Sequence, residues 1–379
     1  MLTFPITLSG TLTGNYYNDR RDHRMVIHKS DRVTLKDVAL IADVSTQTVS
    51  RVVNDHPDVA PDTRQRVKEI IDQVGYRPNF LARSLISNQS YSLGVVIAGL
   101  KLTGPLTVLN GITTVAEAAG YSLQLMELPS FSTNDIEEIL GSLLSRQVDG
   151  IIWAVPEVGE NRKWIRNLPE TIGVPLVFLT MEPQKDINVV AVNNYLGGRM
   201  ATQHLLDQGY TKIAHLAGPL DWWESRQRMR GWEDVLREAG YMVSDHHSVM
   251  GDWSAEKGAE QIHILLDQYP EMDAIFVGND QMALGVLHVL LQQGIRVPED
   301  MGLVGFDNVP EAAYYNPPLT SVHQDQRMVG KVAVEELIKI VRSSSGRHHQ
   351  GTQISLLMDP ILIKRESSRR KPSQHHGFI

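Results

Sequence analysis

Polar and aromatic side chains recur shortly after short apolar runs in the second part of the chain. They are Glu157 after IIWAV, Asp221, Trp222 and then Arg228 after AHLAG, Trp253 after SVM, Asn279 after AIFVG, and Asp307 after LVGF. Carboxylates, amides and guanidinium groups hydrogen-bond to hydroxyls, and an indole ring covers the apolar face of a sugar. These residue types together predict a site for a small sugar. For any one of them a structural role explains the residue equally well, such as a helix cap at Asp221.

The elements that position these side chains follow a regular rhythm from residue 91 onward. Strands are predicted at SLGVVIA, SLQLMEL, DGIIWAV, PLVFLT, KIAHLAG, DAIFVGN and MGLVGFD, and helices at 106–119, 134–146, 194–208, 225–239, 254–268 and 280–293. Alternating strands and helices are typical of βαβ units with parallel sheets. Ligands of such sheets bind beyond the carboxyl ends of the strands, so side chains that follow different strands converge there. Roughly 270 residues are many for one layered unit, so we expect two lobes.

A second group of hydrogen-bonding side chains lies in STQTVSR, residues 45–51, within a segment that has helical periodicity from 34 to 86. Thr34 and Asp37 form a capping-box pattern, and Ser45 is placed to cap the following helix. Two helices joined by a tight turn, with the second polar at its start, are typical of the helix-turn-helix motif. A solvated polar helix face explains this short segment equally well.

The helix-turn-helix interpretation gives each of these side chains a role. Thr46 and Gln47 are best placed to reach base edges, because Gln can pair with adenine and Thr can contact a thymine methyl. Contacts that fix the register on the phosphate backbone are expected from Ser45, Thr48, Ser50 and Arg51. Thr34 and Asn54 belong to the same predicted DNA-binding surface.

Composition and charge bound the possible functions. The chain has 379 residues, of which 42% are hydrophobic and 21% charged, so it is an ordinary globular protein with two or three domains. It has no cysteine, which excludes disulfides and thiolate metal sites. The net charge is −8, but residues 24–90 hold ten Lys or Arg and eight Asp or Glu. A mildly basic small segment is therefore joined to an acidic large one.

Targeting signals are not evident in this sequence. No apolar run approaches the ~20 residues of a membrane span. The start MLTFPITLSGTLTG lacks the basic and apolar regions of a signal peptide. We therefore expect a cytoplasmic protein without a membrane partner. Met25 is a second candidate for the start of translation.

The residues around the polar helix resemble a known family. VTLKDVALIADVSTQTVSRVVN and VAPDTRQRVKEIIDQVGYRPNFLARSL closely resemble the start of LacI/GalR family bacterial repressors. The resemblance covers nearly all of 33–365, because HLAGPLDWWESRQRMRGW, GDWSA, VGNDQMALG, VPEDMGLVGFDN and NPPLTSVHQDQ are similar to core motifs of the family. GDWSA is particularly similar to the lactose repressor branch.

For the N-terminal region, the resemblance implies a three-helix headpiece and a short hinge helix at about 79–86. Leu85 matches the leucine that paired hinge helices insert into the minor groove, where an apolar wedge unstacks a base step. Positions that support backbone or minor-groove contacts match Tyr76, Asn79, Ala82 and Arg83. Asp43 stands where the family often has Gly in the turn, and Asp tolerates a left-handed conformation better than most residues.

For the larger region, the resemblance implies an effector pocket. Arg228, Asn279 and Asp307 match pocket-lining residues, Gln324 matches a further pocket position, and Trp253 matches the tryptophan that stacks on the sugar. Gln326 departs from that branch, which has an aromatic residue there. Trp222–Trp223 is also unusual, so the sugar itself is not identified.

The implied organisation has an all-α headpiece and a two-lobed, periplasmic-binding-protein-like α/β sensor domain. Its parts are a disordered extension at 1–32, the headpiece at 33–78, the hinge helix and linker at 79–90, the sensor domain at 91–365, and a flexible tail at 366–379. The first lobe is expected at 91–192 with 325–351, and the second at 193–324 with 352–363. Effector binding between the lobes would change operator affinity by a coupling of about 1–3 kcal/mol. The tail has no leucine heptad, so a homodimer on a pseudo-palindromic double-stranded DNA operator is expected.

Other functions find less support in the sequence. No G-x-S-x-G, H-E-x-x-H or G-x-x-x-x-G-K-[ST] pattern is present, so we expect no enzyme and no cofactor. The pair Asp221/Glu224 could suggest glycoside hydrolysis but is more typical of a helix start. His348–His349 and His375–His376 lie in polar segments, so no metal site is expected. Two alternatives stay open: a periplasmic-type sugar-binding protein without a regulatory role, and a corepressor-dependent regulator with a non-sugar effector.

Overall fold

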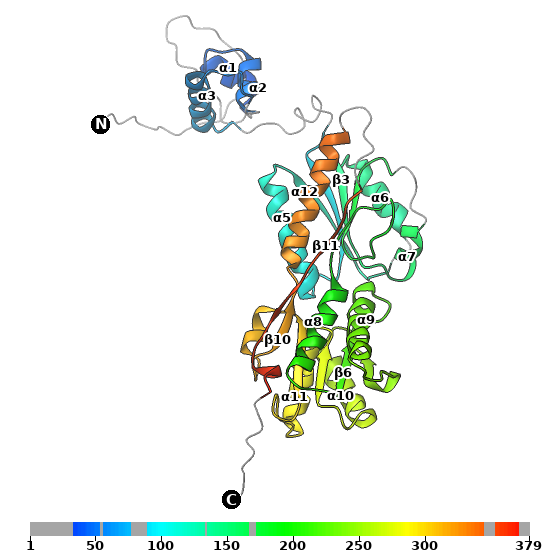
Figure 1. Cartoon of the computed structure of the whole chain (residues 1–379). Helices are drawn as coiled ribbons and strands as arrows, with labels where there is room; N and C mark the ends of the chain where they lie inside the picture. Colours follow the sequence, from blue (N-terminus) through cyan, green and yellow to red (C-terminus); the bar gives the residue numbers. More distant parts are fainter. Residues whose placement is uncertain are drawn as a thin grey trace, which may run out of the picture. The chain divides into compact units, whose positions relative to one another are not determined.

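The computed structural model of the chain describes residues 33–53, 56–76, 89–132, 135–166, 172–344 and 353–370 (Figure 1). The chain divides into two compact units, residues 1–83 and 84–379. Several predicted features lie outside the described residues. They are the extension 1–32, Asn54, the hinge helix 79–86 with Asn79, Ala82, Arg83 and Leu85, and the histidine pairs at 348–349 and 375–376.

The described part of the smaller unit contains three short helices, α1 (Leu35–Ile41), α2 (Thr46–Val53) and α3 (Pro61–Val74). They enclose a small aliphatic core in which Val38, Val49 and Val67 are completely buried. The predicted capping box is present, since the Thr34 hydroxyl and the Asp37 carboxylate each bond to the other residue's backbone N–H. Proline at the first position of α3 begins that helix without losing a hydrogen bond.

The turn between α1 and α2 depends on one left-handed residue. Asp43 has a φ of 51°, which confirms that Asp can keep the turn where the family often has glycine. The amide of Val44 then donates to the carbonyl of Ala39, which closes the turn. Gly75 ends α3 in the same left-handed region, at a φ of 66°.

The larger unit contains two six-stranded sheets. The first has the order β11-β5-β4-β3-β1-β2, and the second β12-β10-β9-β8-β6-β7. The strands of the first sheet are β1 (Ser92–Ala98), β2 (Ser122–Leu128), β3 (Gly150–Ala154), β4 (Leu176–Phe178), β5 (Val189–Val192) and β11 (Ser355–Met358). Those of the second are β6 (Ile213–Ala217), β7 (Ser248–Met250), β8 (Ala274–Val277), β9 (Gly302–Asp307), β10 (Thr320–His323) and β12 (Ile361–Ile363). Among these pairs, only β10–β12 is antiparallel, so the predicted parallel sheets are confirmed.

Helices cover both faces of each sheet (Figure 1). The first sheet packs against α5 (Thr103–Ala118) and α12 (Gln326–Ser344) on one face and α6 (Ile136–Ser145) and α7 (Gly159–Arg166) on the other. The second packs against α10 (Ala255–Gln268) and α11 (Asp280–Gln292) on one face and α8 (Asn194–Asp207) and α9 (Trp223–Glu238) on the other. Short 3-10 helices lie at Asp245–His247, Pro310–Tyr314 and Glu366–Ser368. Each sheet with its helices forms one lobe.

The chain crosses between the lobes at the ends of β5, β10 and β11 within the described ranges. One predicted boundary is wrong at the last crossing. The sequence predicts residues 352–363 in the second lobe, but Ser355–Met358 pair in parallel with β5 of the first sheet. Only β12 enters the second sheet, where it pairs antiparallel with β10.

The predicted start of the flexible tail at 366 is also wrong. Ser367 and Ser368 are completely buried against the second lobe. The Ser367 hydroxyl donates to the carbonyl of Leu303 at 2.7 Å, and the amide of Thr320 donates to it at 2.8 Å. The Ser368 hydroxyl donates to that of Thr320 at 2.7 Å, so two short hydroxyl side chains attach this segment to β9 and β10. At the other end, the predicted linker includes Ser90, but the amide of this residue donates to Asp149 of the first lobe at 2.7 Å.

Candidate functional site

The start of α2 presents polar side chains to solvent. Thr46 and Gln47 are exposed, and neither has a hydrogen-bond partner among the residues that the structure describes. Ser45 caps the helix, since its hydroxyl accepts from the amide of Thr48 at 3.1 Å. The apolar side of the same helix, at Val49 and Val52, is buried in the headpiece core. The helix is thereby fixed while its first residues stay available for contacts.

Two other predicted DNA-binding residues have structural roles within the headpiece. The Thr34 hydroxyl donates to Asp37 at 2.7 Å as part of the capping box. Tyr76 is only 8% exposed and packs in the headpiece core. Arg51 is exposed in the last turn of α2. The geometry therefore favours Thr46, Gln47 and Arg51 over Tyr76 as side chains that reach outward.

A cavity of about 300 Å³ lies between the two lobes of the larger unit. Both lobes contribute to its lining. Thr103, Phe131 and Thr180 come from the first lobe, and the residues named in the next sentence come from the second lobe or from the crossing that follows β10. Six of the eight residues predicted for the effector site line it: Trp222, Arg228, Trp253, Asn279, Asp307 and Gln324. The convergence predicted from the strand ends therefore occurs in the folded chain.

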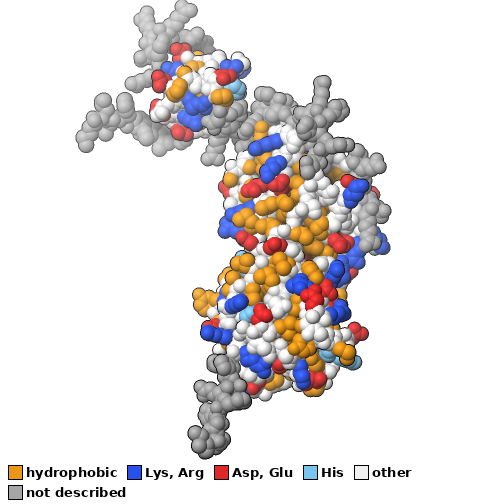
Figure 2. Space-filling view, in the orientation of Figure 1, with side chains coloured by type: hydrophobic (Ala, Val, Ile, Leu, Met, Phe, Trp, Pro, Cys, Tyr) orange, Lys and Arg blue, Asp and Glu red, His pale blue; other side chains and the backbone are white. Residues whose placement is uncertain are grey.

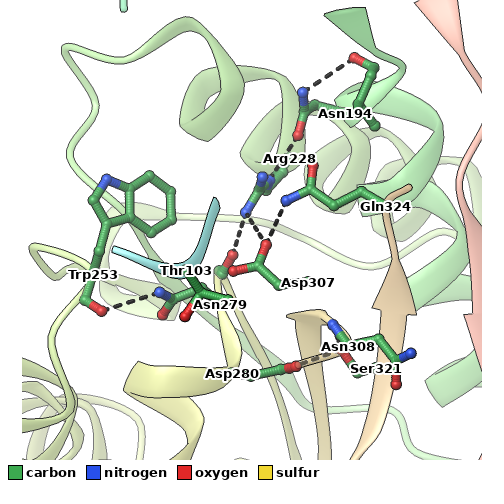
Figure 3. A network of polar contacts seen from close by, with 12 residues as sticks. Thr103, Asn194, Arg228, Trp253, Asn279, Asp280, Asp307, Asn308, Ser321 and Gln324 are labelled. Atoms are coloured by element: carbon green, nitrogen blue, oxygen red, sulfur yellow. Dashed lines mark hydrogen bonds and ion pairs between the residues drawn. The ribbon is translucent and has the colours of Figure 1, made fainter. Parts of the chain in front are cut away.

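Arg228 is the centre of a buried polar network (Figure 3). Its Nε donates to Asn194 Oδ1 at 2.8 Å, and its Nη1 lies 3.8 Å from Asp307 Oδ1. Its Nη1 also donates to the carbonyl of Gly278, and its guanidinium lies 3.7 Å from the ring centre of Phe306. Gln324 donates to the other side of the network, at Asp307 Oδ1. The charged groups at the base of the cavity are thus held in fixed positions.

Aromatic rings form one wall of the cavity. Phe131 of the first lobe and Trp222 of the second meet edge to face with centroids 4.8 Å apart, and Trp222 lies 5.7 Å from Trp253. Trp253 adopts a φ of 77°, which is rare for a bulky residue. Its carbonyl accepts from the Asn279 amide at 3.0 Å, and this bond holds the strained backbone in place. Backbone strain of this kind concentrates at binding sites.

Two carboxyl groups near Arg228 titrate above their ordinary range. Burial raises the pKa of Asp307 to about 6, against the lowering effect of Arg228. Burial, and to a smaller degree Asp307, raise the pKa of Asp280 to about 8. Asp280 is not among the residues that line the cavity, and it accepts from the amide of Val309 and from the hydroxyl of Ser321 at 2.8 and 2.7 Å. At neutral pH the Asp307 carboxylate is therefore the ionised one of the two.

Glu157 and Asp221 do not line the cavity, in contrast to the prediction. Both contact Arg162 of α7: Glu157 Oε1 lies 3.6 Å from its Nε, and Asp221 Oδ1 accepts from its Nη2 at 3.0 Å. Asp221 also does not cap α9, whose N-cap residue is Trp222. Arg162 and Glu157 both belong to the first lobe, so it is the bond from Arg162 to Asp221 of the second lobe that joins the lobes.

Several residues of the cavity were not among the predicted site residues. Asn194 follows β5, a strand that the sequence did not indicate, and Glu224 was considered only as part of a carboxylate pair. Gln281 of the second lobe donates to Thr103 of the first at 3.0 Å, across a distance of 178 residues in the chain. Nothing in the sequence near either residue signals that contact.

The larger unit has a surface of mixed charge. On the face of the larger unit in Figure 2, Lys and Arg side chains are interspersed with Asp and Glu. No described helix is long and apolar enough to cross a membrane. Within the ranges given above, no group of three or more His, Cys, Asp or Glu could hold a metal ion.

Comparison with known proteins identifies the family. A family model described as bacterial regulatory proteins, lacI family, matches residues 34–79, and a periplasmic binding protein-like domain matches residues 202–368. The ribose operon repressor of Escherichia coli (strain K12) is 32% identical over 336 residues, which cover 88% of this chain and 99% of that protein. The chain belongs to the LacI family of bacterial regulatory proteins. It is a DNA-binding transcriptional regulator, and the alternative of a sugar-binding protein without a regulatory role is set aside.

Two solved structures show the same architecture. A Lac repressor dimer bound to operator and the anti-inducer ONPF matches this LacI-family chain with a TM-score of 0.74 at 32% identity, covering 89% of this chain and 99% of that one. The complex of the transcriptional regulator CelR with cellobiose matches with a TM-score of 0.66 at 29% identity, covering 89% and 100%. The predicted fold class is thereby confirmed for the headpiece and for the two-lobed domain.

Proposed function

We propose that this chain is a homodimeric repressor whose affinity for a pseudo-palindromic DNA operator is controlled by a small sugar in the cavity between the lobes. One observation carries the sugar assignment. Among the described residues, nine buried side-chain polar atoms lack a hydrogen-bond partner, and four of them belong to residues that line this cavity: Thr180 Oγ1, Trp223 Nε1, Glu224 Oε2 and Trp253 Nε1. Buried polar groups are ordinarily paired, and a polyhydroxylated ligand would supply the partners.

The remaining walls of the cavity suit the same ligand class. The indole of Trp253 offers an apolar face for a sugar ring. Asp307, Gln324 and Asn279 offer acceptors and donors that pair with hydroxyls. Among the similar proteins, the ribose operon repressor and the CelR–cellobiose complex carry sugars in their names, which supports this class.

The location of the cavity explains how a ligand would act at a distance. Its walls come from both lobes, and Gln281–Thr103 and Asp221–Arg162 already join the lobes beside it. A ligand that contacts both lobes favours one relative arrangement of them, and its differential affinity sets the shift in operator binding. Couplings of this kind amount to about 1–3 kcal/mol.

The DNA-binding surface is proposed at the start of α2. Thr46 and Gln47 would read base edges in the major groove, and the positively charged Arg51 with Ser45, Thr48 and Ser50 would contact phosphates. A two-fold dimer presents two such helices, which calls for two half-sites of opposite orientation. The Lac repressor dimer bound to operator supports this arrangement. We further propose that the protein acts in the cytoplasm and catalyses no reaction.

The test is a thermal-shift screen of the full chain against D-ribose, D-galactose, cellobiose and lactose, with adenine and guanine included. A ligand that binds only the native state raises the melting temperature by mass action. A hit with a neutral sugar supports the proposal, and selection from random duplex DNA with and without that sugar then gives the sign of the response. A purine as the only hit, or no hit, would overturn the sugar assignment and favour the corepressor-dependent regulator with a non-sugar effector.

A further inference from the structure

Glu224 places a carboxylate in the cavity that the residues around it do not satisfy. It is the second residue of α9 and lines the cavity, and its Oε2 is buried without a hydrogen-bond partner in the described part of the chain. An acidic side chain in the first turn of a helix favours the helix by roughly 0.3–1 kcal/mol at an exposed position. That effect does not explain why this carboxylate belongs to the lining of a cavity.

The charge of Glu224 is offset in part by Arg228 and Arg226 and opposed by Glu157, but no residue of the described chain forms an ion pair with it. The other acidic side chain of the lining, Asp307, lies opposite Arg228 at 3.8 Å. Arg228 is itself held by Asn194 and by the carbonyl of Gly278, so its position is fixed on the side of Asp307. Lys101, on the first lobe, also lines the cavity, but its side chain is exposed. The buried part of the cavity thus holds two carboxylates and one guanidinium.

We propose that the ligand of this cavity is an amino sugar whose protonated amine binds the Glu224 carboxylate. This inference rests on the proposed function and narrows its ligand class. A buried carboxylate is costly unless a charge and hydrogen bonds compensate it. A hydroxyl would give one hydrogen bond and leave the charge, whereas an ammonium group gives three donors and the opposite charge.

The other groups of the cavity are compatible with this orientation. With the amine at Glu224, the ring hydroxyls would pair with Asp307 and Gln324, and the ring face would lie on Trp253. Burial raises the pKa of Glu224, and a cation beside it would restore the ionised form. The same carboxylate would repel sugar phosphates and sugar acids.

Titration calorimetry of the full chain at pH 7 tests the proposal with matched pairs of sugars. The pairs are D-glucosamine with D-glucose and D-galactosamine with D-galactose, and D-glucose 6-phosphate serves as the anionic probe. We expect at least one amino sugar to bind about tenfold more tightly than its hydroxyl parent, and the phosphate not to bind. Glu224→Gln should remove the preference for the amine and change the affinity for the parent sugar by less than about threefold.

Matched variants separate the possible causes of a lost preference. Glu233→Gln lies on the same helix in a surface ion pair with Arg237, and it should keep the preference. If Glu224→Gln does not fold, Glu224→Ser serves as the second variant. The preference for the amino sugar over its parent is measured on the wild-type chain and does not depend on either variant. Equal binding of amine and parent, or equal weakening of both by Glu224→Gln, would overturn this inference and leave the proposed function intact. Absence of binding by all of these sugars would overturn this inference, and it would overturn the proposed function as well only if the thermal-shift screen also gave no sugar hit.

Discussion

The headpiece and the inter-lobe cavity of this LacI-family regulator expose their functional groups in opposite ways. On the headpiece, the polar side chains at the start of α2 are exposed, and the buried side of that helix is made of valines. In the cavity, Arg228 and Asn279 are only 5% exposed and are bonded to their neighbours. Binding and stability are therefore separable on the headpiece, whereas the same side chains serve both in the cavity. Substitutions in the two regions should differ accordingly.

The largest expected effect is that of Arg228→Ala. Removing the guanidinium leaves Asp307 buried without its opposite charge and takes one partner from Asn194 and Gly278. Loss of one partner of a buried ion pair typically destabilises a protein by about 3–5 kcal/mol. Urea unfolding of the full chain should show this loss, and sugar binding should disappear with it.

Arg230→Ala is the matched control for Arg228→Ala. Arg230 lies on the same helix with a 68% exposed side chain, 3.6 Å from Asp234. An exposed ion pair contributes about 0–1 kcal/mol, so this variant should unfold close to wild type. Adding Asp307→Asn to an Arg228→Met variant should recover part of the loss, because the uncompensated charge is then removed. Similar losses for Arg228→Ala and Arg230→Ala would contradict the role given to the network.

Trp253→Leu should have a smaller effect on stability and a clear effect on binding. Leucine keeps apolar contacts near Gly218 and Trp222, so the free energy of unfolding should fall by less than about 2 kcal/mol. Loss of the indole face should weaken sugar binding by about tenfold or more, while operator binding without sugar stays unchanged. Trp253→Phe keeps a ring and should lie between the two. An unchanged sugar titration for Trp253→Leu would remove this residue from the site.

The features predicted best from sequence are those with local causes. The helices of the headpiece follow from caps and breakers that act within one turn, such as Thr34, Pro61 and Gly75. The strand SLGVVIA is a continuous apolar run that is buried on both faces, and its observed bounds are those predicted. Arg228, Asn279 and Asp307 were found because each follows a strand of a parallel sheet or matches a family motif.

The features that were missed depend on contacts between distant segments. Strands β5 and β11 have four residues each, too few for a periodicity to stand out, and they are defined by pairing with each other across 166 residues. Glu157 follows a strand, as the rule requires, but it pairs with Arg162 five residues later instead of facing the cavity. No rule based on sequence spacing distinguishes a carboxylate that faces a ligand from one that faces a neighbouring guanidinium.

Asp280→Asn should change how stability depends on pH. Because burial raises the pKa of Asp280 to about 8 in the folded chain, from about 4 when unfolded, the folded state binds an extra proton between these values. The stabilisation that this extra proton gives to the folded state is fully present below about pH 4 and is lost as the pH rises through 8. Asparagine can keep the bonds to Val309 and Ser321 without that charge. The free energy of unfolding, measured with urea between pH 5 and 8, should therefore decline less steeply with pH for the variant than for wild type.

Asp300→Asn serves as the contrast for Asp280→Asn. Its exposed carboxylate bonds to Arg296, which lowers the pKa of Asp300 to about 2. The stabilisation from this ionised carboxylate is lost only in acid. The free energy of unfolding of the variant should therefore depend on pH as it does for wild type between pH 5 and 8. A wild-type slope for Asp280→Asn as well would show that this buried carboxyl does not change protonation in that range.

Gln47→Ala should have the smallest effect on stability and a specific effect on DNA. The side chain is exposed and unpaired within the described headpiece, so the free energy of unfolding should change by less than about 0.5 kcal/mol. On the selected operator, discrimination at one or two base pairs should fall by about 1–3 kcal/mol, because a bidentate base contact is lost. Gln65→Ala on α3, also exposed, should leave discrimination unchanged. Equal weakening on every DNA sequence would mean that Gln47 contacts phosphate, and base reading would then fall to Thr46.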